Sequence, residues 1–442
     1  MNACIPPVLL TYLSWYQAGF TKPTFVYFQG YVWSLLLTKG RKCMTNIAHT
    51  CFFVDRHLSS WERFLSEHHW DLSVVLTCQL ALLTSKLGDQ LKVHGAYLGG
   101  LDTTLIAKAK GKMLGVQKWR QTSANADRGD AIVGHHWGIL GLISFSIPLS
   151  RYVCWPMLMR LIPGQHNPFL WVVDAQGVLT QGTFWDAVVP MVYHLFELLE
   201  HAPLRIVADA YFAKAPFIQP LIERGIQVVT RMRKDAVGWD DPVYCGRGRP
   251  PTRGKQWTLA SLLTHFQPQT ISVFLYGKTL DLTVVVRDMW IRDVTQKVRI
   301  VVVEGITAPL IFLSTDVSLS AKQIIEIYGA RFSIEHALRS LKHQLGLADY
   351  QCTTWVAMVR FVHLACTALC LFRLLLLQEE TSAGDRPTDP SGFFKEGPLS
   401  LSRLRRRFQR FAVEHILFSK SAPTADFEKD DPILEHMLRI VA

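Results

Sequence analysis

Residues 328–342, YGARFSIEHALRSLK, constrain the fold of this chain more than any other stretch. Four polar residues of this stretch fall on one face of a predicted helix: Tyr328, Arg331, Glu335 and Lys342. At about 100° per residue they lie within about 60° of arc, beside an apolar stripe that a core can bury. The polar row spans roughly 21 Å of helix axis, which suits an anionic polymer better than a small ligand. A solvated amphipathic helix is the alternative.

The composition predicts a globular chain with excess positive charge. Of the 442 residues, 49% are hydrophobic and 19% are charged, which argues against a largely disordered protein. A net charge of +11 is expected of a polyanion binder, although many other proteins carry a similar charge. The nine cysteines include no C-x-x-C pair, and no basic region precedes the first apolar run. We therefore expect a reduced compartment, with no zinc site, disulfide framework or signal peptide.

Asp102 follows the apolar, glycine-containing run that begins at residue 93, and we expect a strand to end near it. A carboxylate at such a strand end can hold a cation on a rigid support, whereas inside a strand it must be paired or neutralised. A turn cap is the ordinary alternative. The basic run that follows includes Lys110 and Lys112 and suits phosphate contact, although a solvated loop has the same composition.

Asp209 is the second candidate carboxylate. It follows the apolar strand pattern of residues 204–208 and precedes a helical pattern, and strand ends of this kind often carry functional groups. Asp174, after the apolar residues 169–173, has a similar local context. We favour Asp209 because an aromatic residue and a helix follow it.

These residues together resemble the insertion-sequence DDE transposases of the YREK group, which are cut-and-paste enzymes with an RNase-H-like fold. The order Tyr, two residues, Arg, three residues, Glu, six residues, Lys is the signature of that group. Phe332 is a departure, because many relatives carry Trp there. The resemblance implies that Asp102, Asp209 and Glu335 are catalytic and hold two Mg²⁺ ions, for which Mn²⁺ can substitute.

The resemblance also predicts the DNA contacts and the partners. Tyr328, Arg331 and Lys342 are expected to contact the DNA backbone. The partners are then the terminal inverted repeats, the target DNA and a second copy of the chain in a synaptic homodimer. The expected location is the prokaryotic cytoplasm, in association with the nucleoid and without a membrane.

A long gap between Asp209 and Glu335 predicts an insertion. Within it, Arg247 and Arg249 resemble the core of an AT-hook, which enters the minor groove, although a flexible basic loop would look the same. The resembling enzymes carry an aromatic residue in their insertion that stacks on a flipped base. Trp290 is the candidate here, and an ordinary core tryptophan is the alternative.

The predicted fold is α/β, an RNase-H-like mixed sheet flanked by helices, with an all-α N-terminal domain and a β-rich insertion before the last catalytic helix. Residues 137–145 and 169–173 are expected to be buried core strands. The expected parts are a helical DNA-end-binding domain (1–92), the first part of the catalytic core (93–232), the insertion (233–298), the second part of the core with the signature helix (299–350) and a helical region for dimerisation (351–442).

Residues 355–377 are nearly long enough to span a membrane. They contain Arg360, His363 and Arg373, which are costly in lipid, so we expect a buried core helix. A DNA-binding protein that has lost catalysis and a general RNase-H-like nuclease remain as alternative functions.

Overall fold

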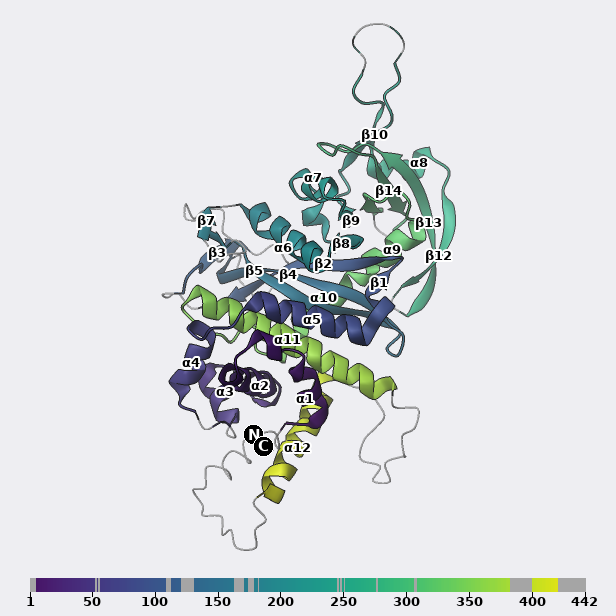
Figure 1. The fold of residues 1–442 in the computed structure, drawn as a ribbon. Coiled ribbons are helices and arrows are strands. Elements are labelled where there is room, and N and C mark those ends of the chain that lie inside the picture. The colour runs from purple at the N-terminus through teal and green to yellow at the C-terminus, as the bar shows by residue number, and fades with distance from the viewer. Residues whose placement is uncertain are drawn as a thin grey trace.

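The computed structural model shows a large mixed sheet with helices on both faces (Figure 1). It describes residues 5–51, 54, 56–108, 113–120, 131–162, 171–173, 179–181, 183–244, 246, 249, 251–275, 277–305, 308–381 and 400–419. The helices are α1 (Pro7–Ser14), α2 (Lys22–Leu37), α3 (Met44–Thr50), α4 (Leu58–Ser66), α5 (Leu72–Leu87), α6 (Phe184–Leu198), α7 (Ala215–Glu223), α8 (Leu262–His265), α9 (Ala321–Ala330), α10 (Phe332–His343), α11 (Trp355–Thr381) and α12 (Leu401–Ser419). The strands are β1 (Lys92–Val93), β2 (Ala96–Ala107), β3 (Gln117–Arg120), β4 (Ala131–Ser146), β5 (Arg151–Leu161), β6 (Trp171–Val173), β7 (Leu179–Gln181), β8 (Leu204–Ala208), β9 (Gln227–Met232), β10 (Val237–Trp239), β11 (Gln256–Thr258), β12 (Gln269–Leu275), β13 (Lys278–Met289), β14 (Val298–Val303) and β15 (Leu310–Ser314).

The main sheet has eleven strands within the described ranges, in the order β12-β13-β14-β15-β9-β8-β2-β4-β3, with β1 also on β2 and β5 also on β4. Strands β2, β8 and β9 are parallel neighbours at its centre. On one side, β4 and β5 continue the sheet in antiparallel fashion, and on the other side β15 to β12 do so. This mixed sheet flanked by helices confirms the predicted RNase-H-like fold class.

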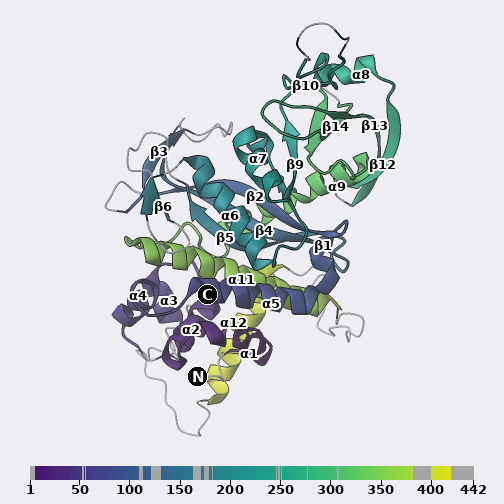
Figure 2. The ribbon, with the colours of Figure 1, turned by 45° about the horizontal axis from the view of Figure 1, so that its top comes forward.

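Helices cover both faces of the sheet. Figures 1 and 2 show α6 and α7 over one face and α5, α10 and α11 over the other. Two adjacent glycines of β2 permit close packing on both sides. A Cβ on Gly99 would lie 3.5 Å from Leu195 of α6, whereas one on Gly100 would lie 2.7 Å from Ile143 and 3.7 Å from Ile334 of α10. The two glycines therefore leave room at the centre of β2 for the side chains that pack on each face of the sheet.

Strand β5 is a core strand that the sequence analysis did not predict. Its Pro156 argues against a central strand, since proline cannot donate a ladder hydrogen bond. The structure accommodates Pro156 because β5 pairs only with β4 and its register shifts beside Gly141. The buried amide of Gln79 donates to the Pro156 carbonyl at 2.8 Å. Of the strand expected at 169–173, residues 171–173 form β6, as predicted, although β6 pairs with β7 and not with the main sheet; residues 169 and 170 lie outside the described residues.

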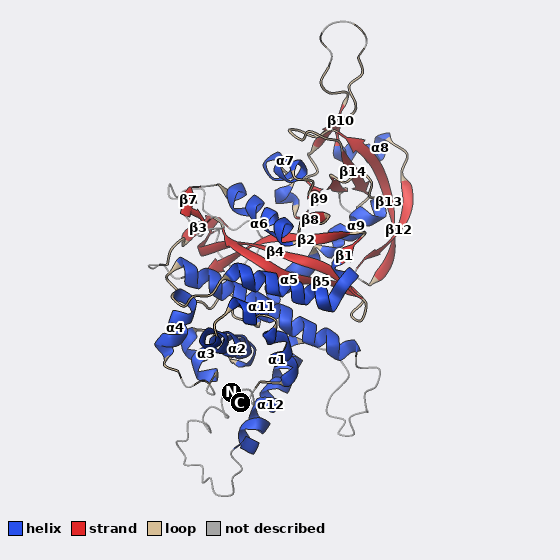
Figure 3. Cartoon of the chain, viewed as in Figure 1, coloured by secondary structure: helices blue, strands red, loops and turns tan. Residues whose placement is uncertain are grey.

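The helices at the two ends of the chain form one layer under the sheet, where Figure 3 shows them together. Helices α1, α2, α4 and α5 all contact α11, and α12 contacts both α2 and α11. The side chains of Phe28, Tyr31 and Trp33 on α2 are almost fully buried in this layer.

Helix α11 contains the one segment of the described residues, Trp355–Gln378, that is long and apolar enough to cross a membrane. Most of it is buried inside the protein. Arg360 donates to the carbonyls of Leu65 at 3.1 Å and Trp70 at 2.8 Å, so its guanidinium group is hydrogen-bonded within the protein. The structure thus uses α11 as a core helix, as the sequence predicted.

The chain between β9 and β14 is rich in strands. Strands β12 and β13 form a hairpin that extends the main sheet through β14, and β10 pairs with β11 in a small separate sheet. A bridge between Trp239 and Trp290 ties that small sheet to the end of β13.

Candidate active site

Two aspartates lie side by side at the centre of the sheet. The parallel pairing of β2 with β8 ends at Leu101 and Ala208, so Asp102 and Asp209 are the next residues of the two strands. Neighbouring strands are about 4.8 Å apart, and residues in register point to the same face. This pairing brings together two carboxylates that lie far apart in the sequence.

Asp102 lies inside β2, so the expectation that the strand ends near it was wrong. Strand β2 continues to Ala107 because β4 still pairs with it there, although β8 has already ended. A carboxylate inside a strand must be paired or neutralised. Asp102 is paired twice: the backbone N–H of Thr103 donates to Oδ1 at 2.7 Å, and Arg331 donates to Oδ2 at 3.4 Å.

Asp209 follows the end of β8, as predicted, and begins a short 3-10 turn (Ala210–Phe212). The N–H of Tyr211 donates to its Oδ1 at 3.0 Å, which orients the carboxylate. The buried hydroxyl of Thr230 on β9 donates to its main-chain carbonyl at 2.8 Å. The carboxylate and the main-chain carbonyl of Asp209 are therefore both held by hydrogen bonds.

Arg231 extends the row of charged residues and was not predicted from the sequence. In the parallel pairing of β8 with β9, Ala208 is opposite Thr230, so Arg231 is next to Asp209 in the same way that Asp209 is next to Asp102. Its side chain is exposed. The available signal was a basic residue at the point where an apolar strand pattern turns polar.

Arg331 joins Asp102 to the third predicted carboxylate, Glu335. Its guanidinium donates to Glu335 Oε1 at 2.5 Å as well as to Asp102 at 3.4 Å. The side chains of Arg331 and Asp102 are only 16% and 17% exposed, so water screens this contact weakly. Helix α10 thus carries Glu335 to the aspartates of the sheet.

The pKa of Asp102 responds to its burial first and to the neighbouring charges after that. Burial raises the pKa of Asp102 to about 6; the Thr103 amide and Arg331 lower it, and the charges of Asp209 and Glu335 raise it. The cluster therefore carries more negative charge than its own arginine offsets. An additional cation would relieve this repulsion.

Carboxylate oxygens of this kind suit Mg²⁺ or Mn²⁺. As the side chains stand, no three His, Cys, Asp or Glu residues within the described ranges are grouped closely enough to hold one ion. Arg331 lies between Asp102 and Glu335 and occupies part of the space that a shared ion needs. The donor set and its excess negative charge fit a divalent cation, provided that Arg331 moves aside.

The predicted signature helix is two helices rather than one. Helix α9 ends at Ala330 and α10 begins at Phe332, with Arg331 between them. Two backbone hydrogen bonds at this junction join residues three apart instead of the four of an α-helix, which tightens the turn. The N–H of Arg331 donates to the carbonyl of Tyr328, and the N–H of Ile334 donates to the carbonyl of Arg331. The single helix predicted from the sequence is therefore interrupted at Arg331 by one tightened turn.

Tyr328 and Lys342 flank the carboxylates on these two helices. The Tyr328 ring packs on Phe312 of β15 with centroids 4.9 Å apart. Burial raises the pKa of Tyr328, Arg331 and Arg231 lower it, and Asp209 raises it, so the phenol lies within electrostatic reach of the site. Lys342 donates to the carbonyl of Leu105 on β2 at 3.2 Å.

The basic run after Asp102 begins with Lys108, whose ammonium group is hydrogen-bonded within the protein. Lys108 donates to the carbonyls of Ala348 at 2.8 Å and Tyr350 at 2.6 Å, and its Nζ lies 3.4 Å from the centroid of the Tyr350 ring. Burial lowers its pKa to about 8. The predicted DNA contacts Lys110 and Lys112 lie outside the described residues, as does the rival carboxylate Asp174.

The other predicted DNA contacts belong to the inserted segment. The indole N–H of Trp290 donates to Asp241 at 3.0 Å, and the residue is partly buried. Arg249 is exposed in the connection between β10 and β11, and Arg247 lies outside the described residues. No contact joins the two described side chains, Trp290 and Arg249, to the carboxylate cluster.

The fold and the site together define an RNase-H-like protein with a carboxylate cluster at the centre of its sheet. Residues 16–273 match the family described as DDE superfamily endonuclease, and residues 188–371 match the family described as Transposase DDE domain. The chain belongs to the DDE superfamily of endonucleases, since the first match covers more than half of it. No curated protein matches the chain. Membership supports a transposase-type function on DNA and implies the use of divalent metal ions.

Proposed function

We propose that the protein is a cut-and-paste insertion-sequence transposase of the YREK group. It binds the terminal inverted repeats of its element, cleaves the DNA there and joins the ends to target DNA. The observation that supports this most strongly is the cluster of Asp102, Asp209 and Glu335, which two strands and a helix place together with Arg331. Both family matches contain Asp209, and each contains one of the other two carboxylates.

Each carboxylate has a defined part in this proposal. Asp102, Asp209 and Glu335 hold two Mg²⁺ ions, or Mn²⁺ in their place, and these ions supply activation of the attacking oxygen and stabilisation of the leaving one. The backbone donors to Asp102 and Asp209 keep two of the three ligands fixed before DNA arrives. Arg331 holds Glu335 near them in the metal-free protein.

The neighbouring side chains bind the DNA backbone. Arg331, once displaced from the carboxylates, and Arg231 each present a planar group that matches phosphate oxygens. Lys342 and the hydroxyl of Tyr328 add a point charge and a hydrogen-bond donor along the same helices. In the insertion, Trp290 stacks on a flipped base and Arg249 enters the minor groove with Arg247.

Each segment of the chain has its own role in this proposal. The helices of residues 1–92 bind the transposon end, segments 93–232 and 299–350 form the catalytic core, 233–298 is the insertion, and 351–442 supports a homodimer in the synaptic complex. The protein acts in the cytoplasm of a prokaryote, on nucleoid DNA.

Cleavage of a supercoiled plasmid tests this proposal. The plasmid carries the inverted repeats that flank the element, and wild-type protein is compared with Glu335→Ala in Mg²⁺ or EDTA. We expect breaks at the repeat ends that require metal and are lost in Glu335→Ala. Glu197→Ala, which changes an exposed glutamate of α6, is the matched control and keeps wild-type cleavage.

The other outcomes identify the alternatives. Retardation of the repeat ends in a gel without cleavage in any divalent metal would identify a DNA-binding protein without catalysis. Metal-dependent cleavage that ignores the repeats would identify a general nuclease.

A further inference from the structure

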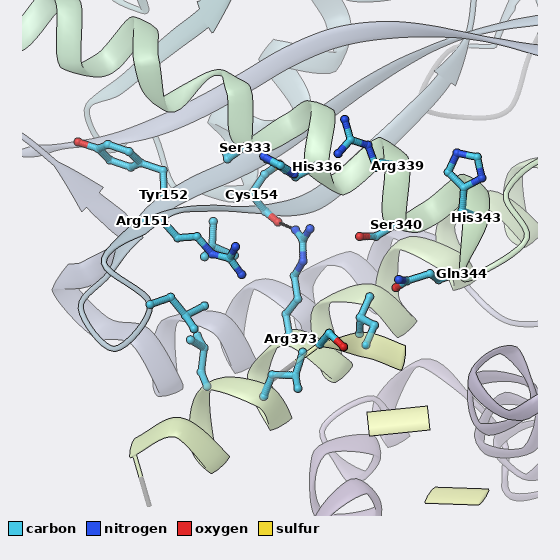
Figure 4. Close-up of a pocket in the computed structure, with 16 residues that line it drawn as sticks. Arg151, Tyr152, Cys154, Ser333, His336, Arg339, Ser340, His343, Gln344 and Arg373 are labelled. Atoms are coloured by element: carbon cyan, nitrogen blue, oxygen red, sulfur yellow. Dashed lines mark hydrogen bonds between the residues drawn. The ribbon is translucent and has the colours of Figure 1, made fainter. Parts of the chain in front are cut away.

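A cationic cavity lies against α10, the helix that carries Glu335. It has a volume of about 520 Å³ and is enclosed by β5, α10 and the facing ends of α11 and α12 (Figure 4). Arg151 of β5, Arg339 of α10 and Arg373 of α11 line it, and we call it the arginine pocket. No aspartate or glutamate is among the described residues that line it.

The positive charge of this pocket is partly desolvated. Arg373 reaches from α11 to the carbonyl of Cys154, as Figure 4 shows. Burial lowers the pKa of Arg373; Cys154 and Cys370 raise it, and the nearby charge of Arg151 lowers it. A buried guanidinium group that has a second cation near it is stabilised by a bound anion.

Two buried polar atoms of the pocket also lack a protein partner. Ser333 is 6% exposed, and its hydroxyl has no hydrogen-bond partner among the described residues. The same holds for Oε1 of Gln344, just beyond the end of α10, although a phosphate oxygen cannot donate to this acceptor. Leaving a buried polar group unpaired costs about 1–3 kcal/mol. A ligand with oxygen acceptors would satisfy the Ser333 hydroxyl and the guanidinium groups together.

The pocket and the candidate active site share helix α10. The pocket's lining residue His336 directly follows Glu335 on α10. Burial raises the pKa of the Cys154 thiol to about 12; Arg373 lowers it, and the charge of Asp102 raises it. The lining of the pocket is therefore within electrostatic reach of the carboxylate cluster. Arg151 and Arg339 are both exposed at its rim, where a polymer can reach them.

We propose that the arginine pocket binds a backbone phosphate of the DNA that the active site processes. The guanidinium fork of arginine matches phosphate oxygens, and three arginines on three elements form a site for one phosphate and its sugar. This assignment rests on the proposed function, because it takes the DNA at the carboxylates as the source of the phosphate. A phosphate held there fixes the strand relative to Glu335.

The salt dependence of DNA binding tests the assignment. The dissociation constant of a fluorescein-labelled DNA duplex is measured by anisotropy in EDTA from about 50 to about 200 mM KCl, a range in which phosphate contacts dominate. Because the pocket binds one phosphate, we expect the double variant Arg151→Gln/Arg339→Gln to reduce the slope of log K against log salt by about 0.9, the value of one phosphate contact, and each single variant to reduce it by part of that amount. Arg224→Gln, on α7 over the opposite face of the sheet, is the matched control and keeps the wild-type slope.

Each alternative result has a distinct meaning. Wild-type slopes in all pocket variants, or no duplex binding by wild-type protein, overturn the assignment. Reduced slopes in a protein that never cleaves the plasmid would leave the pocket in place and remove the transposase function. If sodium phosphate at matched ionic strength raises the Tm of wild type more than that of Arg151→Gln while the DNA slope is unchanged, the pocket binds free phosphate and the DNA assignment is wrong. Melting curves check the fold of the variants. If Arg151→Gln does not fold, the salt slope of Arg339→Gln, a change at an exposed residue, decides the assignment.

Discussion

Asp102 and Asp209 occupy neighbouring positions on two parallel strands, each one residue beyond the last pair, Leu101 and Ala208. This places two like charges on one face of a rigid sheet. The arrangement is costly without a cation, and Arg331 provides one in the metal-free protein.

The first prediction concerns the protonation of Asp102. Its pKa is raised from 3.8 to about 6, so the folded protein binds this proton more tightly than the unfolded chain does. Stability in EDTA therefore falls as pH rises from about 4 to about 6, by up to about 3 kcal/mol. We expect Asp102→Asn to be about 1–3 kcal/mol more stable than wild type at about pH 8 and no more stable at about pH 4. Urea unfolding measures both.

Asp89→Asn is the control for this experiment, since Asp89 is 96% exposed. It is expected to change the free energy of unfolding by less than about 0.5 kcal/mol at either pH. An Asp102→Asn protein that is less stable than wild type at about pH 8 would contradict the cost that burial and the neighbouring carboxylates impose on the charge of Asp102.

The second prediction concerns Arg331 and metal. Arg331→Gln leaves Asp102 and Glu335 without their cation, and we expect a loss of about 3 kcal/mol in EDTA. Added Mg²⁺ or Mn²⁺ should then raise the Tm of the variant more than that of wild type, because the ion replaces the missing charge without having to displace a guanidinium. Arg331→Lys is expected to recover part of the stability. Equal metal-induced shifts in all three proteins would show that Arg331 and the metal do not compete.

The third prediction concerns Arg231, which the sheet places beside Asp209. Removal of one preorganised donor to a reacting phosphate typically lowers kcat by about 10²-fold or more. We expect Arg231→Gln to reduce plasmid cleavage by about tenfold to a hundredfold while the Tm changes little, since the side chain is exposed. Arg224→Gln again serves as the control. Full cleavage by Arg231→Gln would exclude a role for this arginine.

The fourth prediction concerns the two glycines of β2. A Cβ on Gly100 would lie 2.7 Å from Ile143 and 3.7 Å from Ile334, which precedes Glu335. We expect Gly100→Ala to cost about 1–3 kcal/mol, because Ile143 must shift, and to lower kcat, because that shift occurs on the face of the sheet that α10 covers. Gly99→Ala makes a similar clash on the α6 face and is expected to cost similar stability with less effect on kcat. The two variants are compared by urea unfolding and by plasmid cleavage, and equal losses of kcat would contradict the prediction.

The fold class and the grouping of the three carboxylates were predicted from the resemblance that the spacing of Tyr328, Arg331, Glu335 and Lys342 carries, while apolar patterns, which are local signals, predicted the strands near Asp102 and Asp209. The position of Asp102 inside a strand was not predictable, because it depends on where a different strand, β8, ends. Strand β5 was missed because Pro156 is acceptable only at an edge with a shifted register, and both conditions are set by β4. The interruption of the helix at Arg331 and the contribution of Arg231 likewise depend on partners from distant segments.

Helix α11 has a consequence for the order in which the protein can fold. The buried aromatic residues of α2 pack against a helix that is synthesised more than three hundred residues later. Long-range contacts of this kind slow folding, and the first helices keep apolar surface exposed while the rest of the chain emerges from the ribosome. A product cut short before Trp355 would retain all three carboxylates and still lack the helix that covers both the N-terminal layer and the sheet.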